Sequence, residues 1–175
     1  MNASEEQERE SSEWNVRELS AGEFDALSAA SEYGGFQQTS EMAALAQSEG
    51  MQTQYVGLVD SHDVPVAGAL VAFSQGRFGV EGSLWLGPLC NGNDGEQMTA
   101  LTDGLREVAE RVHAISLTCW PNQVYCVRDS QGKVMAEPND EMVREYERLG
   151  WKHAGFARGY GALMNRWNYV KDLRA

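Results

Sequence analysis

The sequence predicts an α/β protein of the α+β kind, in which a mixed, mostly antiparallel sheet is flanked by helices. Three apolar segments joined by short turns, residues 52–59, 64–73 and 77–86, indicate an antiparallel meander. Residues 93–112 predict a long helix, because their apolar side chains recur every three or four positions. Residues 114–119 then alternate as in a further strand. The sheet and the helices must therefore bury their apolar faces against each other.

The composition is that of a globular protein with an acidic surface. Of its 175 residues, 42% are hydrophobic and 23% are charged. The net charge of −12 disfavours binding to DNA or to other phosphate backbones. No apolar segment approaches the roughly 18 residues that a membrane helix needs. The N-terminus is acidic and lacks the apolar core of a secretory signal, so we expect a cytoplasmic location.

The cysteines and histidines indicate neither a disulfide framework nor a metal centre. Cys90, Cys119 and Cys126 are odd in number and contain no C-x-x-C pair. The three histidines lie far apart, and none has the spacing of metal ligands. No Ser/His/Asp or Cys/His signature of a nucleophilic enzyme is present either. We therefore predict no metal, no cofactor and no catalytic residue from these motifs.

The N-terminal region divides into a tail and the start of a domain. Residues 1–13 carry five glutamates and no buriable side chain after the first methionine, which predicts a disordered acidic tail. Everything after it, residues 14–175, is expected to be one domain. Residues 14–19 alternate as in a half-buried strand.

Two short helices are predicted before the meander. Ser20 and Glu23 form a capping box at the start of the first helix. Thr39 is the N-cap candidate of the second helix, and Gly50 supplies its stop.

A glycine and a proline organise the middle of the chain. Pro88 cannot donate to a sheet and restrains Gly87, so the third strand of the meander should end there. Asp94 and Gln97 then form the predicted cap of the long helix. A strand, a glycine-containing loop and a helix N-terminus often form a substrate-facing corner. A plain strand-to-helix connection is the alternative.

The C-terminal part of the sequence predicts three more features. Residues 124–128 and 133–136 flank a turn and indicate a small hairpin or an extended loop. Residues 139–149 have the apolar spacing of a helix. Residues 151–156 and 163–173 are expected to be strands of the sheet.

This order of elements is that of the acetyltransferase-like (GNAT) fold. GNAT proteins bind a pyrophosphate on backbone N–H groups of an R/Q-x-x-G-x-G/A motif between a strand and a helix. The nearest candidate here, residues 158–163 (RGYGAL), ends in leucine where a small residue belongs, and no helix is expected after it. An acyl-CoA N-acetyltransferase is therefore the less favoured interpretation.

Six short motifs resemble, in their order along the chain, the N-terminal half of the FemABX family. They are residues 36–42 (FQQTSEM), 55–59 (YVGLV), 66–70 (VAGAL), 86–89 (LGPL), 150–151 (GW) and 165–173 (NRWNYVKDL). The resemblance spans about residues 14–173. It is carried by the Gln-Thr-Ser start of the second helix, the Gly-Pro corner and the final R-x-x-x-V-x-D-L segment.

The resemblance implies a non-ribosomal peptidyltransferase of peptidoglycan bridge synthesis, a class associated with cell shape and antibiotic resistance. Two tandem GNAT-like domains transfer an amino acid from aminoacyl-tRNA to the peptide of a lipid-linked or UDP-linked muropeptide, without CoA. The precursor lies in a channel that the first domain helps to form. The chain ends where the second domain would begin, so it is expected to lack the catalytic half and the tRNA contacts.

The sequence also departs from this family's pattern. Relatives often have a lysine where Ala46 stands and an Asp-Pro strand end where Trp120-Pro121 stands. A phosphate contact at Ala46 is therefore not expected. These departures leave a second interpretation, a non-catalytic binding or assembly module that retains the fold.

The resemblance and the predicted corner together give a set of precursor-binding candidates. Arg166 is the strongest anion ligand, because a guanidinium binds phosphate or carboxylate bidentately. Its alternative role is a salt bridge to Asp172 or to a helix acid. The full set is Gln38, Trp85, Gly87, Pro88, Tyr125 and Arg166.

Overall fold

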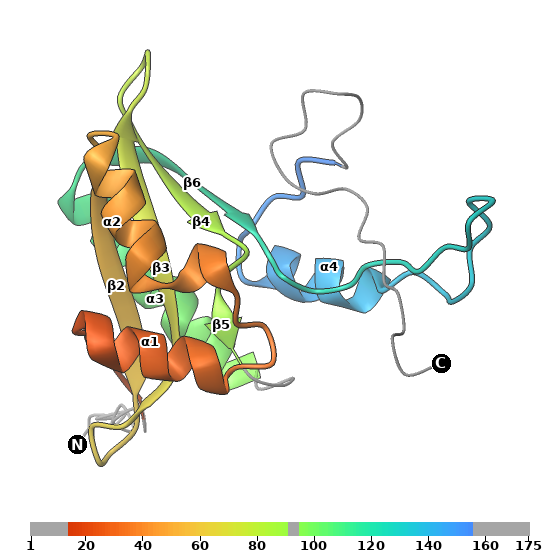
Figure 1. Cartoon of the computed structure of the whole chain (residues 1–175), viewed down its shortest axis with the longest axis horizontal. Helices are drawn as coiled ribbons and strands as arrows, with labels where there is room; N and C mark the ends of the chain where they lie inside the picture. The colour runs from red at the N-terminus through yellow and green to blue at the C-terminus, as the bar shows by residue number, and fades with distance from the viewer. Residues whose placement is uncertain (1–13, 91–94, 156–175) are drawn as a thin grey trace, which may run out of the picture. The chain divides into compact units, whose positions relative to one another are not determined.

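The computed structural model describes residues 14–90 and 95–155. The chain divides into two compact units, Met1–Pro138 and Asn139–Ala175 (Figure 1). Four predicted features lie outside the described residues. They are the tail, the cap at Asp94, the motif at 158–163 and the last strand with Arg166. The elements of the first unit are β1 (Asn15–Glu18), α1 (Ala21–Ala30), the 3-10 helix η1 (Phe36–Gln38), α2 (Ser40–Ser48), β2 (Gln52–Val59), β3 (Pro65–Gln75), β4 (Val80–Trp85), β5 (Leu89–Cys90), α3 (Gly95–Arg111) and β6 (Ala114–Trp120), and the second unit contains α4 (Asp140–Arg148).

The sheet of the first unit is mixed and mostly antiparallel, as predicted. Its strands run in the order β1-β2-β3-β4-β6, and β5 pairs with β3 beside this path. All neighbours are antiparallel except β4 and β6, which are parallel. The parallel pair arises because α3 carries the chain back across the sheet between these two strands.

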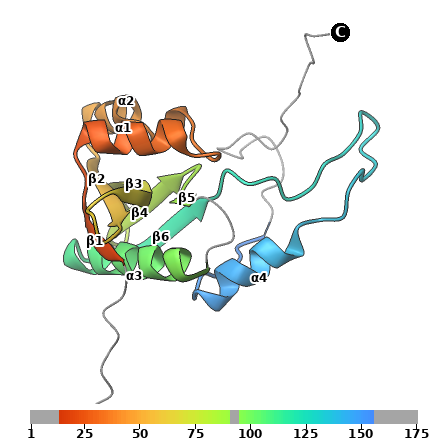
Figure 2. The same cartoon turned by 90° about the horizontal axis from the view of Figure 1, so that it is seen from below.

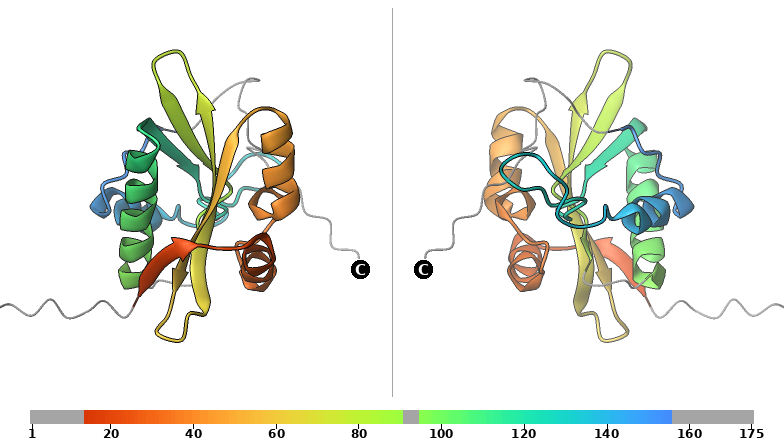
Figure 3. Two further views of the ribbon diagram at one scale, coloured as in Figure 1. Left: turned by 90° about the vertical axis from the view of Figure 1, so that its left-hand side faces the viewer. Right: turned by 90° about the vertical axis from the view of Figure 1, so that its right-hand side faces the viewer.

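Helices cover both faces of the sheet (Figures 2 and 3). Helices α1 and α2 pack on one face, where Phe24 of α1 stacks on Tyr55 of β2 at a ring distance of 5.0 Å. The other face is covered by α3, whose buried stripe includes Leu101, Leu105 and Val108. Because side chains alternate between the two faces along each strand, the sheet presents apolar side chains to the helices on both faces.

The predicted starts of α1 and α2 are confirmed. Ser20 and Glu23 form both hydrogen bonds of a capping box at α1. The side chain of Thr39 accepts a hydrogen bond from the backbone N–H of Met42 at α2. Gly50 has a positive φ of 86° directly after α2, which is the conformation predicted for a helix stop.

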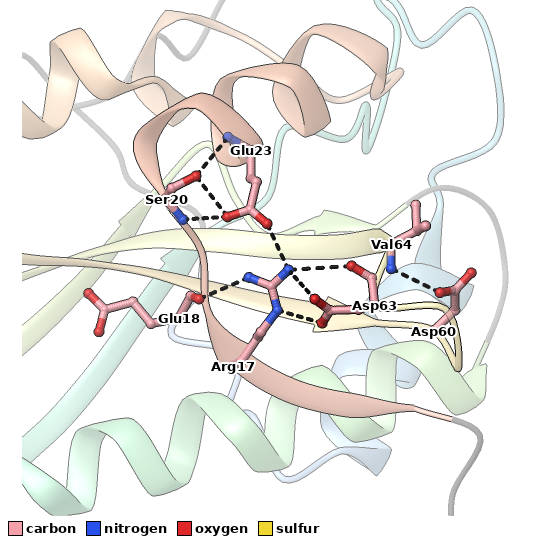
Figure 4. Close-up of polar contacts among 7 residues, drawn as sticks. All are labelled: Arg17, Glu18, Ser20, Glu23, Asp60, Asp63 and Val64. Atoms are coloured by element: carbon pink, nitrogen blue, oxygen red, sulfur yellow. Dashed lines mark hydrogen bonds and ion pairs between the residues drawn. The ribbon is translucent and has the colours of Figure 1, made fainter.

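An arginine joins three elements at one edge of the sheet. The guanidinium of Arg17 on β1 donates to Glu23 of α1 at 2.7 Å and to Asp63 in the β2–β3 turn at 2.8 Å (Figure 4). These contacts raise the pKa of Arg17 and lower the pKa of Glu23 to about 2. In the same turn, the carboxylate of Asp60 accepts from two backbone N–H groups, which lowers its pKa. The turn predicted at residues 60–63 is therefore present and fixed by side chains.

Two expectations about strands were wrong. Strand β5 was not expected, because a two-residue strand after Pro88 has no periodicity to detect. Residues 151–155 form no strand, although one was predicted over 151–156. The backbone N–H of Trp151 instead donates to the carbonyl of Tyr146, and their rings meet edge-on at 6.3 Å. The hydrogen bond from Trp151 is part of the C-terminal cap of α4, in which Gly150 has a positive φ of 89°.

The segment between β6 and α4 resolves the choice between a hairpin and a loop. A single antiparallel bridge joins Arg128 and Val134. The carboxylate of Asp129 closes the turn by accepting from the backbone N–H groups of Gln131 and Lys133. Backbone hydrogen bonds from Asp129 to the carbonyl of Lys133 and from Met135 to the carbonyl of Val127 flank the bridge. The segment therefore forms the small hairpin, which was one of the two expected alternatives. Among the residues that the structure describes, no helix is long and apolar enough to cross a membrane.

Candidate functional site

The parallel strands β4 and β6 end side by side. Trp85 and Trp120 are the last residues of the two strands and are direct partners in their register. Ligands of open α/β sheets bind beyond the carboxyl ends of parallel strands, because the following loops leave the sheet there. The Gly87-Pro88 and Pro121-Asn122 segments are those loops here. We therefore take this strand end as the candidate site.

The two tryptophans lie on the same face of the sheet. Leu70 of β3 belongs to the core cluster under α1 and α2, and alternation places Ala72 on that face as well. Ala72 is the partner of Ser83, and Ser83 is the partner of Thr118. Trp85 and Trp120 are two positions beyond these residues. Both tryptophans are therefore on the face that α1 and α2 share.

That face is only half covered. Helices α1 and α2 contact mainly β2 and β3, so the β4–β6 part of the face carries partly accessible side chains. Glu81, Ser116 and Thr118 are exposed there, and Ser83, Trp85 and Trp120 are half-buried. These six side chains form what we call the open face. Two aromatic rings beside hydroxyl groups are suited to a ligand with both apolar and hydrogen-bonding surface.

The side chain of Gln38, the last residue of η1, contacts the end of β4. Its Nε2 donates to the carbonyl oxygen of Trp85 at 2.8 Å, and its Oε1 accepts from the backbone N–H of Leu70 at 2.9 Å. The residue is fully buried. A Cβ atom on Gly87 would lie 2.9 Å from the carboxamide, so glycine is required for this close approach. The peptide bond between Gly87 and Pro88 is cis.

A second contact joins the loop after β6 to the loop after α1. The side-chain amide of Asn122 donates to the carbonyl oxygen of Tyr33 at 3.0 Å. Close to Tyr33 is Phe36, whose side chain is 59% exposed. The loop that follows Trp120 is thus held against the loop after α1.

The structure brings four of the predicted candidates together. Gln38, Trp85, Gly87 and Pro88 form one corner, in which Trp85 is half-buried and the other three are buried. Tyr125 is half-buried in the segment after β6. Sequence reasoning did not select Trp120 or Asn122. The signal available for them was the repeated pattern of an apolar strand that ends in tryptophan shortly before a proline.

The position at which relatives carry a lysine is not on the surface. Ala46 is 1% exposed and packs in the core under α2. Among the described residues, no group of three or more histidine, cysteine or acidic side chains is arranged to hold a metal ion.

A separate hollow lies on the α3 side of the sheet, between β1, β2 and α3. Its volume is about 570 Å³, and its walls combine the apolar Val16, Val56 and Val108 with the charged Glu18, Glu107 and Arg111. It includes none of the predicted binding residues. We keep the strand end as the candidate site, because strand pairing and the loop contacts converge there.

Comparison with known proteins decides the family. A sequence model of the FemAB family matches residues 19–175. The chain belongs to the FemAB family. This confirms the FemABX resemblance, and most of the chain takes part in the match. A search of curated proteins gave no significant match.

Solved structures confirm the GNAT-like fold. The crystal structure of FemX matches with a TM-score of 0.67 and 18% identity, over 83% of this chain and 34% of the FemX chain. A probable acetyltransferase matches with a TM-score of 0.54 and 10% identity, over 86% of this chain and 98% of its own. The ribosomal-protein-alanine N-acetyltransferase from Brucella melitensis biovar Abortus 2308 matches with a TM-score of 0.51 and 16% identity, over 88% and 99% of the two chains. This FemAB chain therefore spans about a third of FemX.

Proposed function

We propose that this FemAB chain is the N-terminal GNAT-like domain of an aminoacyltransferase in peptidoglycan bridge synthesis. In the proposed reaction, an amine of the precursor peptide attacks the ester carbonyl of aminoacyl-tRNA. The new amide bond forms as the ester breaks, and the tRNA hydroxyl leaves with a proton. Family membership supports the reaction class. The 34% coverage of FemX supports the assignment to one domain of a larger transferase.

The observation that carries the proposal is the pairing of Trp85 with Trp120 at the edge of the open face. We propose that a lipid-linked or UDP-linked muropeptide binds there, against the two rings and the Gly87-Pro88 corner. Tyr125 and Arg166 remain proposed contacts, with Arg166 as an anion ligand. The precursor and aminoacyl-tRNA are both cytoplasmic molecules, so a cytoplasmic location is part of the proposal.

The chemistry of the corner fits binding better than proton transfer. Gln38, Trp85, Trp120 and Asn122 carry no group that titrates near neutral pH. A general base for the attacking amine must then come from outside the described corner, for which the second domain is the proposed source. The same observation favours a second candidate function, a binding or assembly module without transfer activity.

Calorimetric titration with UDP-N-acetylmuramyl pentapeptide tests the binding part of the proposal. Trp120→Ala should weaken binding by about tenfold or more, because it removes one ring of the pair. Phe78→Ala is the matched control, since Phe78 is an aromatic residue that is 79% exposed and precedes β4 at its opposite end. Equal effects of the two variants, or no binding by the unaltered protein, would contradict the proposal.

Two further measurements separate the alternatives. A transfer assay with aminoacyl-tRNA and the muropeptide should show product only when a second FemABX domain is present. Product from this chain alone would contradict the proposal that the catalytic groups lie in the second domain. Titration with acetyl-CoA addresses the less favoured acetyltransferase function, and micromolar binding would favour it over the proposal.

A further inference from the structure

The sheet has a gap on one side of β3. From Ala72 to Gln75, β3 pairs with β4, and at Ala67 and Gly68 it pairs with β5. Residues 69–71 between these two stretches have no strand partner on that side in the described part of the chain. Backbone groups of a strand point alternately to its two sides, and in this stretch those of Leu70 point into the gap. They are buried there and require another hydrogen-bonding partner.

The carboxamide of Gln38 fills this gap. It accepts from the N–H of Leu70 at 2.9 Å and donates to the carbonyl of Trp85 at 2.8 Å, so one side chain joins β3 to the last residue of β4. A primary amide presents a donor and an acceptor in the same geometry as a peptide group. The exposed fraction of Gln38 is 0%, which leaves it no surface for contact with a ligand.

This bridge fixes the backbone that carries Trp85. On one side Trp85 pairs with Trp120, and on the other its carbonyl is bound by Gln38. Beyond it the chain leaves the strand at once, through Leu86 with a positive φ of 51°. The backbone from which the Trp85 ring projects is therefore held by the strand ladder and, outside that ladder, by Gln38.

We infer that Gln38 is a positioning residue of the precursor site, which acts on ligand affinity through Trp85 and not by contact with the ligand. The inference rests on the proposed function for the identity of the ligand. It replaces the sequence-based expectation that Gln38 itself binds the precursor. A role in stability alone is the competing explanation, and it predicts no special link to the Trp85 ring.

A double-mutant cycle separates these explanations, because Trp85→Ala removes the ring but keeps the backbone carbonyl that Gln38 binds. Gln38→Met removes both hydrogen bonds at similar volume. In the presence of Trp85, Gln38→Met should weaken binding of UDP-N-acetylmuramyl pentapeptide by about five- to tenfold. In the Trp85→Ala background the same change should alter affinity by less than about twofold. Urea unfolding should show the same loss of stability in both backgrounds.

Gln37→Met is the matched control, since Gln37 is the half-buried neighbour in the same 3-10 helix. It should leave affinity unchanged. Equal weakening by Gln38→Met in both backgrounds, or no weakening where Trp85 is present, would overturn the inference. If Gln38→Met does not fold, Gln38→Glu takes its place at a pH above the raised pKa of the introduced acid. Its carboxylate then still accepts from Leu70 but cannot donate to Trp85.

A readout without ligand keeps the inference testable if the precursor does not bind. Acrylamide quenching of Trp85 alone is obtained by subtracting the matched Trp85→Phe protein. Gln38→Met should increase this quenching, whereas Gln37→Met should not. Unchanged quenching in Gln38→Met would overturn the inference. Failure of the unaltered protein to bind the precursor, together with increased quenching in Gln38→Met, would count against the proposed function only.

Discussion

The side-chain amide of Gln38 donates a hydrogen bond of 2.8 Å to the backbone carbonyl of Trp85, which lies 47 positions later in the chain. The side-chain oxygen of Gln38 accepts a hydrogen bond from the backbone N–H of Leu70. The two hydrogen bonds therefore require a donor and an acceptor on one planar group. The residue is fully buried, and neither bond can be replaced by water without rearrangement.

This relationship predicts a pH-dependent stability for Gln38→Glu. The protonated acid can accept from Leu70 and donate to Trp85, whereas the carboxylate would be a buried charge facing a carbonyl oxygen. The folded-state pKa of the introduced acid is therefore raised. The variant should be most stable below the ordinary glutamate pKa and lose stability as the pH rises through the raised value. Urea unfolding across this range measures the effect, and Gln38→Met should lack it.

Gly87→Ala should destabilise the protein by about 1–3 kcal/mol, because its Cβ would lie 2.9 Å from the Gln38 carboxamide in a buried corner. Gly22→Ala is the matched control. Nothing lies within 4 Å of a Cβ at Gly22, which is exposed in α1, so alanine should be neutral or slightly stabilising. The midpoints of urea unfolding of the two variants, each compared with the unaltered protein, measure the effect. Similar midpoints would mean that the corner can move away from the Gln38 side chain.

Protonation of Glu23 should contribute to the loss of folding stability at acidic pH. The contacts with Arg17 and Ser20 lower its pKa to about 2, whereas in the unfolded chain it titrates near 4.5. A lowered folded pKa gives stability that is present above pH 4.5 and is lost as the pH falls toward 2. Glu23→Gln should therefore reduce this loss. NMR titration of the Glu23 carboxyl group checks the shift directly.

The same ion pair should respond to salt. Arg17, Glu23 and Asp63 are partly or fully exposed, so their attraction is screened at high ionic strength. Addition of about 0.5 M NaCl should reduce the stability difference between Glu23→Gln and the unaltered protein. A difference that does not change with salt would indicate that the capping hydrogen bonds to Ser20 dominate.

Cys119 and Cys126 should differ in their rates of alkylation. Burial raises the pKa of the Cys119 thiol to about 12, so only ~0.01% of it is thiolate at pH 8. Cys119 should therefore react slowly with iodoacetamide in the folded protein and rapidly after unfolding. Cys126, which lies beyond β6, serves as the internal comparison. Peptide mass spectrometry of timed samples measures both rates, and rapid labelling of Cys119 would show that β6 opens.

The net charge predicts weak binding of this chain to tRNA. A charge of −12 repels a phosphate backbone, so the tRNA contacts of the proposed transferase should lie in the second domain. Filter binding at low salt is expected to show retention no greater than for an acidic control protein. Tight, salt-sensitive retention would contradict this assignment.

Local signals explain which parts of the fold were predictable. The capping box at Ser20, the N-cap at Thr39 and the stop at Gly50 each act within a few residues, so the sequence indicates them directly. The apolar stripe of α3 and the strand β2 are equally visible, because their periods match the geometry of a helix and a strand. The strand expected at residues 151–156 is not formed at 151–155, where the backbone N–H of Trp151 instead completes the C-terminal cap of α4.

The sequence by itself determined the family, the fold class, the starts of α1 and α2, and the corner at Gly87-Pro88. Only the tertiary structure decided what these residues do together. The pairing of Trp85 with Trp120 depends on the parallel register of two strands that are separated by α3. The role of Gln38 depends on a gap in β3 pairing that no local pattern encodes. Hydrogen bonds between groups distant in sequence are set by strand register and packing, and these exist only once the chain is folded.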